Sequence, residues 1–253
     1  MSVKNFLIQR LTYFNRLNAK NLIIKSIINQ EQFNNDVVNM HQIDEKNAGD
    51  WNCGPHLYFN QLKGKSLDIS DYKSYNKYVR SEYTKQIINN SLIIGGGGLL
   101  NRGSFERQMK MFESISQKGK KTVLWGLGHN EKDRSTFGKV SKYNIDTSKF
   151  GIVGVRDYNM KEEYVPCVSC LHPVMETKLD VVNEVGVIFH KKTLKDKSLL
   201  NKLSNYPSSS NTLKIEEIIN FIAQTDTIVT DSYHAMYWSM LLGKKVVALP
   251  NSS

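Results

Sequence analysis

The chain has few cysteines and no long apolar run. Its 253 residues include only Cys53, Cys167 and Cys170, an odd count that offers no disulfide framework and suits a reducing compartment. Nowhere do about eighteen apolar residues follow one another, and the N-terminus lacks the apolar region of a signal peptide. We therefore expect a soluble, cytoplasmic protein without a membrane span.

Motifs for metal, redox and nucleotide chemistry are missing or incomplete. The sequence contains no D-x-D pair, no G-x-G-x-x-G turn and no Walker-type glycine loop. Cys167 and Cys170 form one C-x-x-C, but there is no second one, and His172 would add only a third ligand at an awkward spacing. Buried small residues are the preferred interpretation over a zinc site or redox pair. We expect neither a metal nor a cofactor.

Basic residues are in excess. Lys and Arg number 34 against 24 Asp and Glu, which gives a formal net charge of +10. Such a surface attracts a phosphorylated metabolite, an acidic membrane face or nucleic acid. The lysines are spread along the chain, and no zinc-finger spacing or basic heptad helix accompanies them, so we expect no nucleic-acid partner.

Apolar and basic residues interleave over residues 3–30. This pattern is typical of one or two amphipathic helices. The preferred interpretation is a helix that caps a sheet. The alternative is an interfacial helix, which would give peripheral association with the inner face of the membrane.

Short apolar runs that end in polar turns predict an α/β fold. The expected strands cover residues 37–43, 92–94, 122–127, 152–155, 185–189, 227–229 and 246–250. Helical patterns follow over residues 105–118, 214–224 and from 233 onward. A break near residues 173–183 suggests two Rossmann-like domains facing a cleft, an N-terminal one over residues 1–175 and a C-terminal one over 183–253.

The stretch Thr230–Tyr237 is the most informative part of the sequence. A β-branched strand runs into Asp231, Ser232 and His234, and an apolar helix follows. Open α/β sheets bind ligands at the carboxyl ends of their strands, where helix starts offer free N–H groups to anions. His234 is therefore a candidate catalytic residue, with a buried core histidine as the alternative.

Two further turns carry candidate binding residues. Asn47, Gly49 and Asp50 form an N-x-G-D turn after the first strand, where Asp50 could bind hydroxyls or simply act as a helix N-cap. Gly95, Gly96, Gly97 and Gly98 follow the second strand, so the backbone there must approach something closely or adopt positive φ. We expect a ligand there, with a tight strand-to-helix crossing as the alternative.

His129 and Arg156 each follow an apolar strand, and so should meet at the same sheet edge. A guanidinium there can grip a carboxylate or phosphate with two hydrogen bonds. The alternative is a structural ion pair between Arg156 and Asp157 or a glutamate.

In their order, these motifs resemble the polysaccharide pyruvyl transferase family: the N-x-G-D turn, the glycine run, Val155-Arg156-Asp157 and the stretch through His234. The resemblance implies a GT-B-type enzyme that moves an enolpyruvyl unit from phosphoenolpyruvate to a hydroxyl pair of a sugar or lipid-linked oligosaccharide, forming a pyruvyl ketal.

In that scheme His234 supplies a proton, Arg156 clamps the donor, and His129 binds phosphate or assists proton transfer. The rival hypotheses are a GT-B-type glycosyltransferase that uses a nucleotide sugar and a non-catalytic sugar-binding protein. Such folds normally continue beyond the strand at 246–250, so we expect either a compact second domain or an incomplete one.

Overall fold

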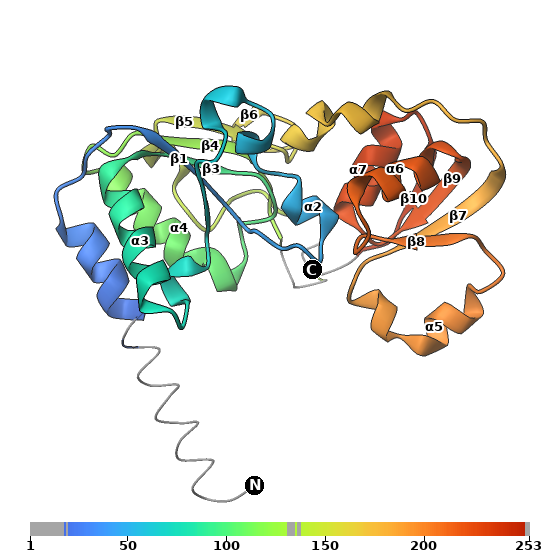
Figure 1. Ribbon diagram of the computed structural model, residues 1–253, viewed down its shortest axis with the longest axis horizontal. Coiled ribbons are helices and arrows are strands. Elements are labelled where there is room, and N and C mark those ends of the chain that lie inside the picture. Colours follow the sequence, from blue (N-terminus) through green and yellow to red (C-terminus); the bar gives the residue numbers. More distant parts are fainter. Residues whose placement is uncertain (1–17, 19, 131–134, 136–137, 251–253) are drawn as a thin grey trace, which may run out of the picture.

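Six parallel strands in the N-terminal half form one sheet, in the order β2-β1-β3-β4-β5-β6 (Figure 1). The strands of this sheet are β1 (Val37–His41), β2 (Ser66–Asp68), β3 (Ser91–Gly95), β4 (Thr122–Leu127), β5 (Ile152–Val155) and β6 (Glu163–Tyr164). This computed structural model describes residues 18, 20–130, 135 and 138–250. The central strands are buried on both faces, which explains their continuous apolar sequences.

Helices cover this sheet and close the first hydrophobic core. They are a helix over residues 20–29, α3 (Lys77–Asn89) and α4 (Gly103–Ser116). Ile27 is fully buried in the core, so residues 20–29 confirm the expected sheet cap. The remaining part of the expected 3–30 pattern, residues 1–17 and 19, lies outside the described residues.

Four parallel strands in the C-terminal half form a second sheet, in the order β10-β9-β7-β8. Its strands and helices are β7 (Asn183–Phe189), α5 (Lys197–Lys202), β8 (Ser208–Ser210), α6 (Ile215–Ala223), β9 (Thr225–Thr230), α7 (Tyr233–Leu241) and β10 (Lys245–Ala248). The isoleucines of α6 and the fully buried Trp238 of α7 build a second core. The mixed α/β class with parallel sheets is thus confirmed, and both sheets are consistent with Rossmann-like units.

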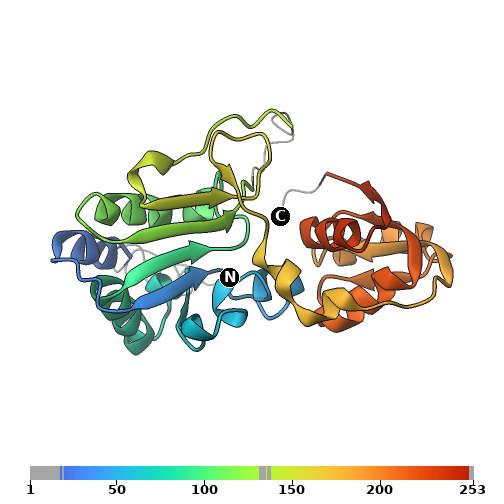
Figure 2. The same cartoon turned by 90° about the horizontal axis from the view of Figure 1, so that it is seen from above.

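The short helix α2 (Ala48–Trp51) belongs to the first half by sequence but packs against the second. Ala48 lies in the second core, and its N–H donates to the Asn211 carbonyl over 2.8 Å. Lys191 also forms an ion pair with Asp44, just before α2. Figure 2 shows α2 and the 3-10 segments after it near the middle of the molecule, where the two halves meet.

The connections contain single turns of 3-10 helix. These cover Pro55–Leu57, Asn60–Leu62, Asp71–Lys73, Thr147–Lys149, Val168–Leu171, Pro173–Glu176 and Thr193–Lys195. Cys167 is buried and Cys170 half-buried, and Cys167 contacts Ser169 and His234, so it packs as the small buried residue that was expected. None of the described helices has the length and apolar character needed to cross a membrane.

Candidate functional site

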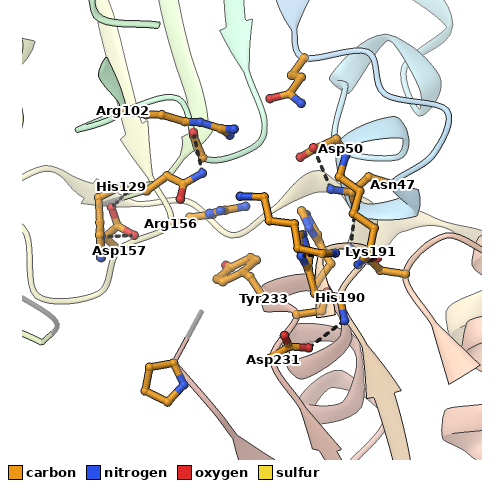
Figure 3. Close-up of a pocket in the computed structure, with 18 of the residues that line it drawn as sticks. Asn47, Asp50, Arg102, His129, Arg156, Asp157, His190, Lys191, Asp231 and Tyr233 are labelled. Atoms are coloured by element: carbon orange, nitrogen blue, oxygen red, sulfur yellow. Dashed lines mark hydrogen bonds and ion pairs between the residues drawn. The ribbon is translucent and has the colours of Figure 1, made fainter. Parts of the chain in front are cut away.

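A pocket of about 300 Å³ lies where the carboxyl ends of strands from both sheets approach each other (Figure 3). Most of the candidate residues found from the sequence line it, namely Asn47, Asp50, Gly98, His129, Arg156, Asp231, Ser232 and His234. Gly49, Gly95, Gly96 and Gly97 do not. The strand-end argument therefore brings together side chains that lie far apart in the sequence.

The buried side chain of Arg156 forms part of the pocket wall. Its guanidinium stacks on the Tyr233 ring, with Cζ 3.7 Å from the ring centroid. Nε and Nη1 are buried, yet neither has a hydrogen-bond partner. Among the described residues, no carboxylate lies within ion-pair distance of Arg156, so the alternative of a structural pair with Asp157 is wrong. A buried cation with open N–H donors is what an anionic ligand requires.

Gly128 makes room for this arginine. A Cβ built at residue 128 would lie 2.3 Å from Arg156 Nε. The position directly after β4 therefore has to be glycine, because the Arg156 side chain lies directly against it.

Asp157 instead pairs with His129. Its carboxylate lies 3.2 Å from His129 Nδ1 and accepts hydrogen bonds from the His129 N–H at 2.8 Å and the Tyr143 hydroxyl at 2.9 Å. Burial alone would raise the pKa of Asp157, but these donors outweigh it and hold that pKa below its ordinary value. Asp157 thus fixes the backbone at His129 and keeps its carboxylate beside the imidazole ring.

Asn47 and Asp50 occupy the first turn of α2. Asn47, not Asp50, is the N-cap, because its Oδ1 accepts from the Gly49 N–H over 3.2 Å. This frees Asp50 to face the pocket, where its carboxylate accepts from Asn47 Nδ2 at 2.8 Å. Burial raises the pKa of Asp50 to about 6, even though Lys191 and the nearby arginines oppose that rise. A carboxylate of this kind is a competent general base near neutral pH.

His234 lies deep in the wall of the pocket. Its Nε2 is 3.5 Å from Cys167 Sγ, and its ring packs against Trp238 with 5.5 Å between centroids. Gly49 covers the other edge so closely that a Cβ there would lie 2.0 Å from Nδ1. Burial, reinforced by the Arg156 charge, lowers the pKa of His234 well below its ordinary value. The imidazole of His234 is therefore neutral at pH 7 in the free protein.

Asp231 is held by the turn that follows β7. Its Oδ1 accepts from the His190 N–H at 2.7 Å, and its Oδ2 accepts from the Thr193 hydroxyl. Asp231 therefore braces the turn after β7, where His190 is also buried and lines the pocket. Ser232 begins α7 without capping it through its side chain, so its hydroxyl is not used by the helix.

The glycine run mainly accommodates the protein itself. Gly96 adopts φ 45°, and a Cβ there would lie 2.0 Å from the Cys53 carbonyl oxygen. Gly95 is closed off by Trp125 of β4, and only Gly98 reaches the pocket. Neighbouring backbone thus fills the space beside Gly95 and Gly96, as in the alternative of a tight crossing, whereas Gly97 adopts φ 85° and, among the described residues, has only the side chains of Cys53 and Asp50 near it.

Sequence reasoning missed several polar residues of the pocket. They are Gln42, Arg102, Asn130, Tyr233, His190, Lys191, Lys192 and Asn211. The signal for three of these was present, since His190, Lys191 and Lys192 directly follow a buried strand. Asn211 carried no such signal, and it acts by linking the halves: it donates to Asn47 Oδ1 at 3.3 Å and accepts from the Lys191 N–H at 2.8 Å.

The pocket is suited to an anion next to a hydroxylated ligand. Two arginines and two lysines line it, while the carboxylates of Asp157 and Asp231 are engaged by protein donors. Residues 56–253 match the family model described as Polysaccharide pyruvyl transferase. The chain belongs to the polysaccharide pyruvyl transferase family.

As a polysaccharide pyruvyl transferase by family, the protein is expected to act on a sugar acceptor. The matched range includes Gly98, His129, Arg156 and His234 but begins after the N-x-G-D turn. The search of curated proteins gave no match to this sequence. The geometry of α2 is therefore the independent argument for including Asn47 and Asp50 in the site.

Proposed function

We propose that the protein transfers a pyruvyl group from phosphoenolpyruvate to two hydroxyls of a sugar in a polysaccharide or its precursor, forming a pyruvyl ketal. The observation that carries the proposal is the buried Arg156 guanidinium, which lines a pocket rich in basic residues and whose Nε and Nη1 have no hydrogen-bond partner. A donor that bears both a carboxylate and a phosphate can bind this guanidinium and the basic residues around it.

The donor carboxylate is assigned to Arg156 because a carboxylate matches two N–H groups of one guanidinium. The phosphate then faces His129 and the basic residues after β7, Lys191 and Lys192. These groups would also stabilise the inorganic phosphate as it leaves.

The reaction is balanced without any further reagent. A proton adds to the methylene carbon of the donor, and the first sugar hydroxyl attacks the neighbouring carbon, which has developed oxocarbenium character. The carbon–oxygen bond to phosphate breaks, and the second hydroxyl attacks the same carbon. Of the two hydroxyl protons released, one balances the proton taken up by the methyl group and the other leaves with phosphate or water.

Asp50 is the base that we assign to the acceptor hydroxyl. Its pKa of about 6 leaves it mostly ionised at pH 7 while keeping it basic enough to accept a proton. Asn47 orients the Asp50 carboxylate through a hydrogen bond of 2.8 Å.

His234 remains the proposed acid, with one condition added by its burial. The free protein holds this imidazole neutral, but a bound donor carries several negative charges, which favour the protonated ring. Protonation would then be coupled to donor binding. His129, paired with Asp157, binds phosphate or takes over the proton transfer.

Residues 1–175 and 183–253 are proposed to be two Rossmann-like domains in a GT-B-type arrangement around this pocket. The two separate hydrophobic cores support this division. Because phosphoenolpyruvate is a cytoplasmic metabolite, we propose a cytoplasmic reaction, at the inner face of the membrane when the acceptor is lipid-linked.

The test has a binding arm and a turnover arm. Phosphoenolpyruvate at 100 times its dissociation constant should stabilise the protein by about 2.7 kcal/mol, seen as a raised melting temperature. With aryl glycosides or lipid-linked sugars as acceptors, phosphate release should accompany a new ketal methyl signal in NMR spectra. Stabilisation by UDP-glucose or GDP-mannose, with none by phosphoenolpyruvate, would instead identify a glycosyltransferase. Sugar binding without turnover of any donor would leave the non-catalytic alternative.

A further inference from the structure

A second pocket, of about 460 Å³, lies against other residues of α2. Asn47 and Asp50 line the first pocket, whereas Ala48 and Trp51 line the second. The other residues that line it come from both halves of the chain and include Glu45, His172, Leu213, Lys214 and Glu216. The proposed reaction leaves this second pocket without a role.

Trp51 gives the second pocket an exposed aromatic face. This side chain is 42% exposed, although the other two tryptophans, Trp125 and Trp238, lie in strand and helix packing. Within the described part of the chain, the Trp51 indole stacks on no other ring and donates no side-chain hydrogen bond. Leu213, 40% exposed, adds apolar surface to the same pocket. An indole left open in a hollow is suited to contact the apolar face of a ligand.

The polar groups of the second pocket favour a neutral ligand. Glu45 and Glu216 provide two carboxylates against one ammonium, that of Lys214, and the described lining contains no arginine. The first pocket, in contrast, is lined by two arginines and two lysines. An anion would meet repulsion in the second pocket, whereas a polyol could donate its hydroxyl hydrogens to the carboxylates.

The ring of His172 faces Glu216 in the second pocket. Its Nδ1 accepts from the Val174 N–H over 3.3 Å, so the neutral ring carries its proton on Nε2. That nitrogen lies 3.8 Å from Glu216 Oε1, and the side chain of Glu216 is about half exposed. One ligand hydroxyl could therefore bridge an N–H donor and a carboxylate acceptor.

We propose that the second pocket binds a neutral saccharide unit, with one face of the sugar ring on the Trp51 indole and its hydroxyls on Glu45, His172 and Glu216. Asp50 and Trp51 are consecutive residues of α2, so one acceptor chain can contact both pockets. This link to the acceptor rests on the proposed function, whereas saccharide binding in the second pocket is independent of it.

The test is ligand-detected NMR on the full chain with neutral trisaccharides: maltotriose, cellotriose, mannotriose and chitotriose. We expect saturation transfer to at least one. Trp51→Ala should weaken that interaction at least about tenfold, because the stacking surface is lost. Glu216→Gln, at an exposed position that should not disturb folding, should weaken it at least about threefold. The matched control is Tyr78→Ala, which removes an exposed aromatic side chain from α3, outside the second pocket, and should change nothing.

Absence of transfer to all four trisaccharides would overturn the proposal. So would binding that survives both variants, or binding that is lost in Asp50→Asn but not in Trp51→Ala, since the sugar would then occupy the first pocket. A phosphoenolpyruvate melting-temperature shift, measured in parallel, separates the two hypotheses. Donor binding without trisaccharide binding refutes only the saccharide site, whereas Trp51-dependent trisaccharide binding without donor binding refutes only the transferase reaction.

Discussion

Replacing Asp50 with Asn should make the protein more stable and less active. The Asp50 carboxylate has a pKa of about 6 in the folded state against an ordinary 3.8, because it is buried. Ionising it at pH 8 therefore costs the native state about 3 kcal/mol, at 1.36 kcal/mol for each unit of pKa. Asn has the same shape, can still accept from Asn47, and carries no charge.

Because the pKa of Asp50 is raised in the folded state, the stability change caused by Asp50→Asn should depend on pH. A carboxyl whose folded pKa is raised favours the native state below pH 3.8, and that advantage is lost as pH rises through about 6. The stability gain of Asp50→Asn should therefore be near zero at pH 4 and approach about 3 kcal/mol at pH 8.

Urea unfolding of parent and variant at pH 4, 6 and 8 measures this gain. Asp226→Asn is the control, because hydrogen bonding and charge from the exposed Lys245 lower the pKa of Asp226, so its loss should leave stability unchanged or slightly reduced at pH 8. A gain that is equal at all three pH values, or a loss at pH 8, would refute the burial argument. Phosphate release should fall at least about 100-fold in Asp50→Asn, and in the parent it should decline below pH 6. Full activity in the variant would remove Asp50 from the role of base.

Substitutions at four other positions, with His129→Asn as a comparison, test the site by phosphate release and melting temperature. Arg156→Lys keeps the charge but loses the planar fork, so KM for phosphoenolpyruvate should rise at least about tenfold with folding unchanged; early melting with normal KM would indicate a structural role. Tyr233→Leu should weaken donor binding up to about 30-fold, as expected for the loss of a desolvated cation–π contact of ~2 kcal/mol with Arg156. Tyr233→Phe keeps the ring and should restore binding. Equal effects of the two substitutions would exclude a role for this contact. His234→Asn should lower kcat at least about 100-fold with little change in donor binding; near-normal turnover there, with His129→Asn inactive, would move the acid role to His129. Gly49→Ala should cost ~1–3 kcal/mol, because its Cβ would lie 2.0 Å from His234 Nδ1; unchanged melting would contradict that contact.

Much of the fold could be predicted because its strands are locally encoded. Buried parallel strands read as apolar runs, and each expected run became a strand within a few residues of its expected bounds. β8 (Ser208–Ser210) could not be found in this way, since three serines carry no strand pattern. It exists because β7 pairs with it, with Ile188 opposite Ser209. α3 was also missed, because only Tyr83, Ile87 and Ile88 are buried along its thirteen residues.

The site was predictable only as far as strand ends determine it. His129 and Arg156 converge because β4 and β5 are parallel neighbours that share one carboxyl edge, and His234 joins them because the carboxyl end of β9 in the second sheet faces the same pocket. The protonation states of these side chains, in contrast, depend on tertiary contacts and cannot be predicted from strand ends. The residues around His234 in the sequence do not indicate that Gly49 and Cys167 will enclose its ring. That burial lowers the pKa of His234.

The short helix α2 explains why these contacts escape a reading of neighbouring residues. Its N-cap Asn47 uses one side-chain oxygen both for the Gly49 N–H and for Asn211 of the second half. Forming the helix and docking it on the second sheet are therefore one event, and it buries Asp50 and closes Gly49 over His234 together. The same docking raises one pKa and lowers the other, so a neutral imidazole and a basic carboxylate face the same pocket. In the free protein this imidazole is unprotonated, so His234 can serve as the acid only once the negative charge of a bound donor raises its pKa. The docking that sets both shifts joins residues more than 150 positions apart.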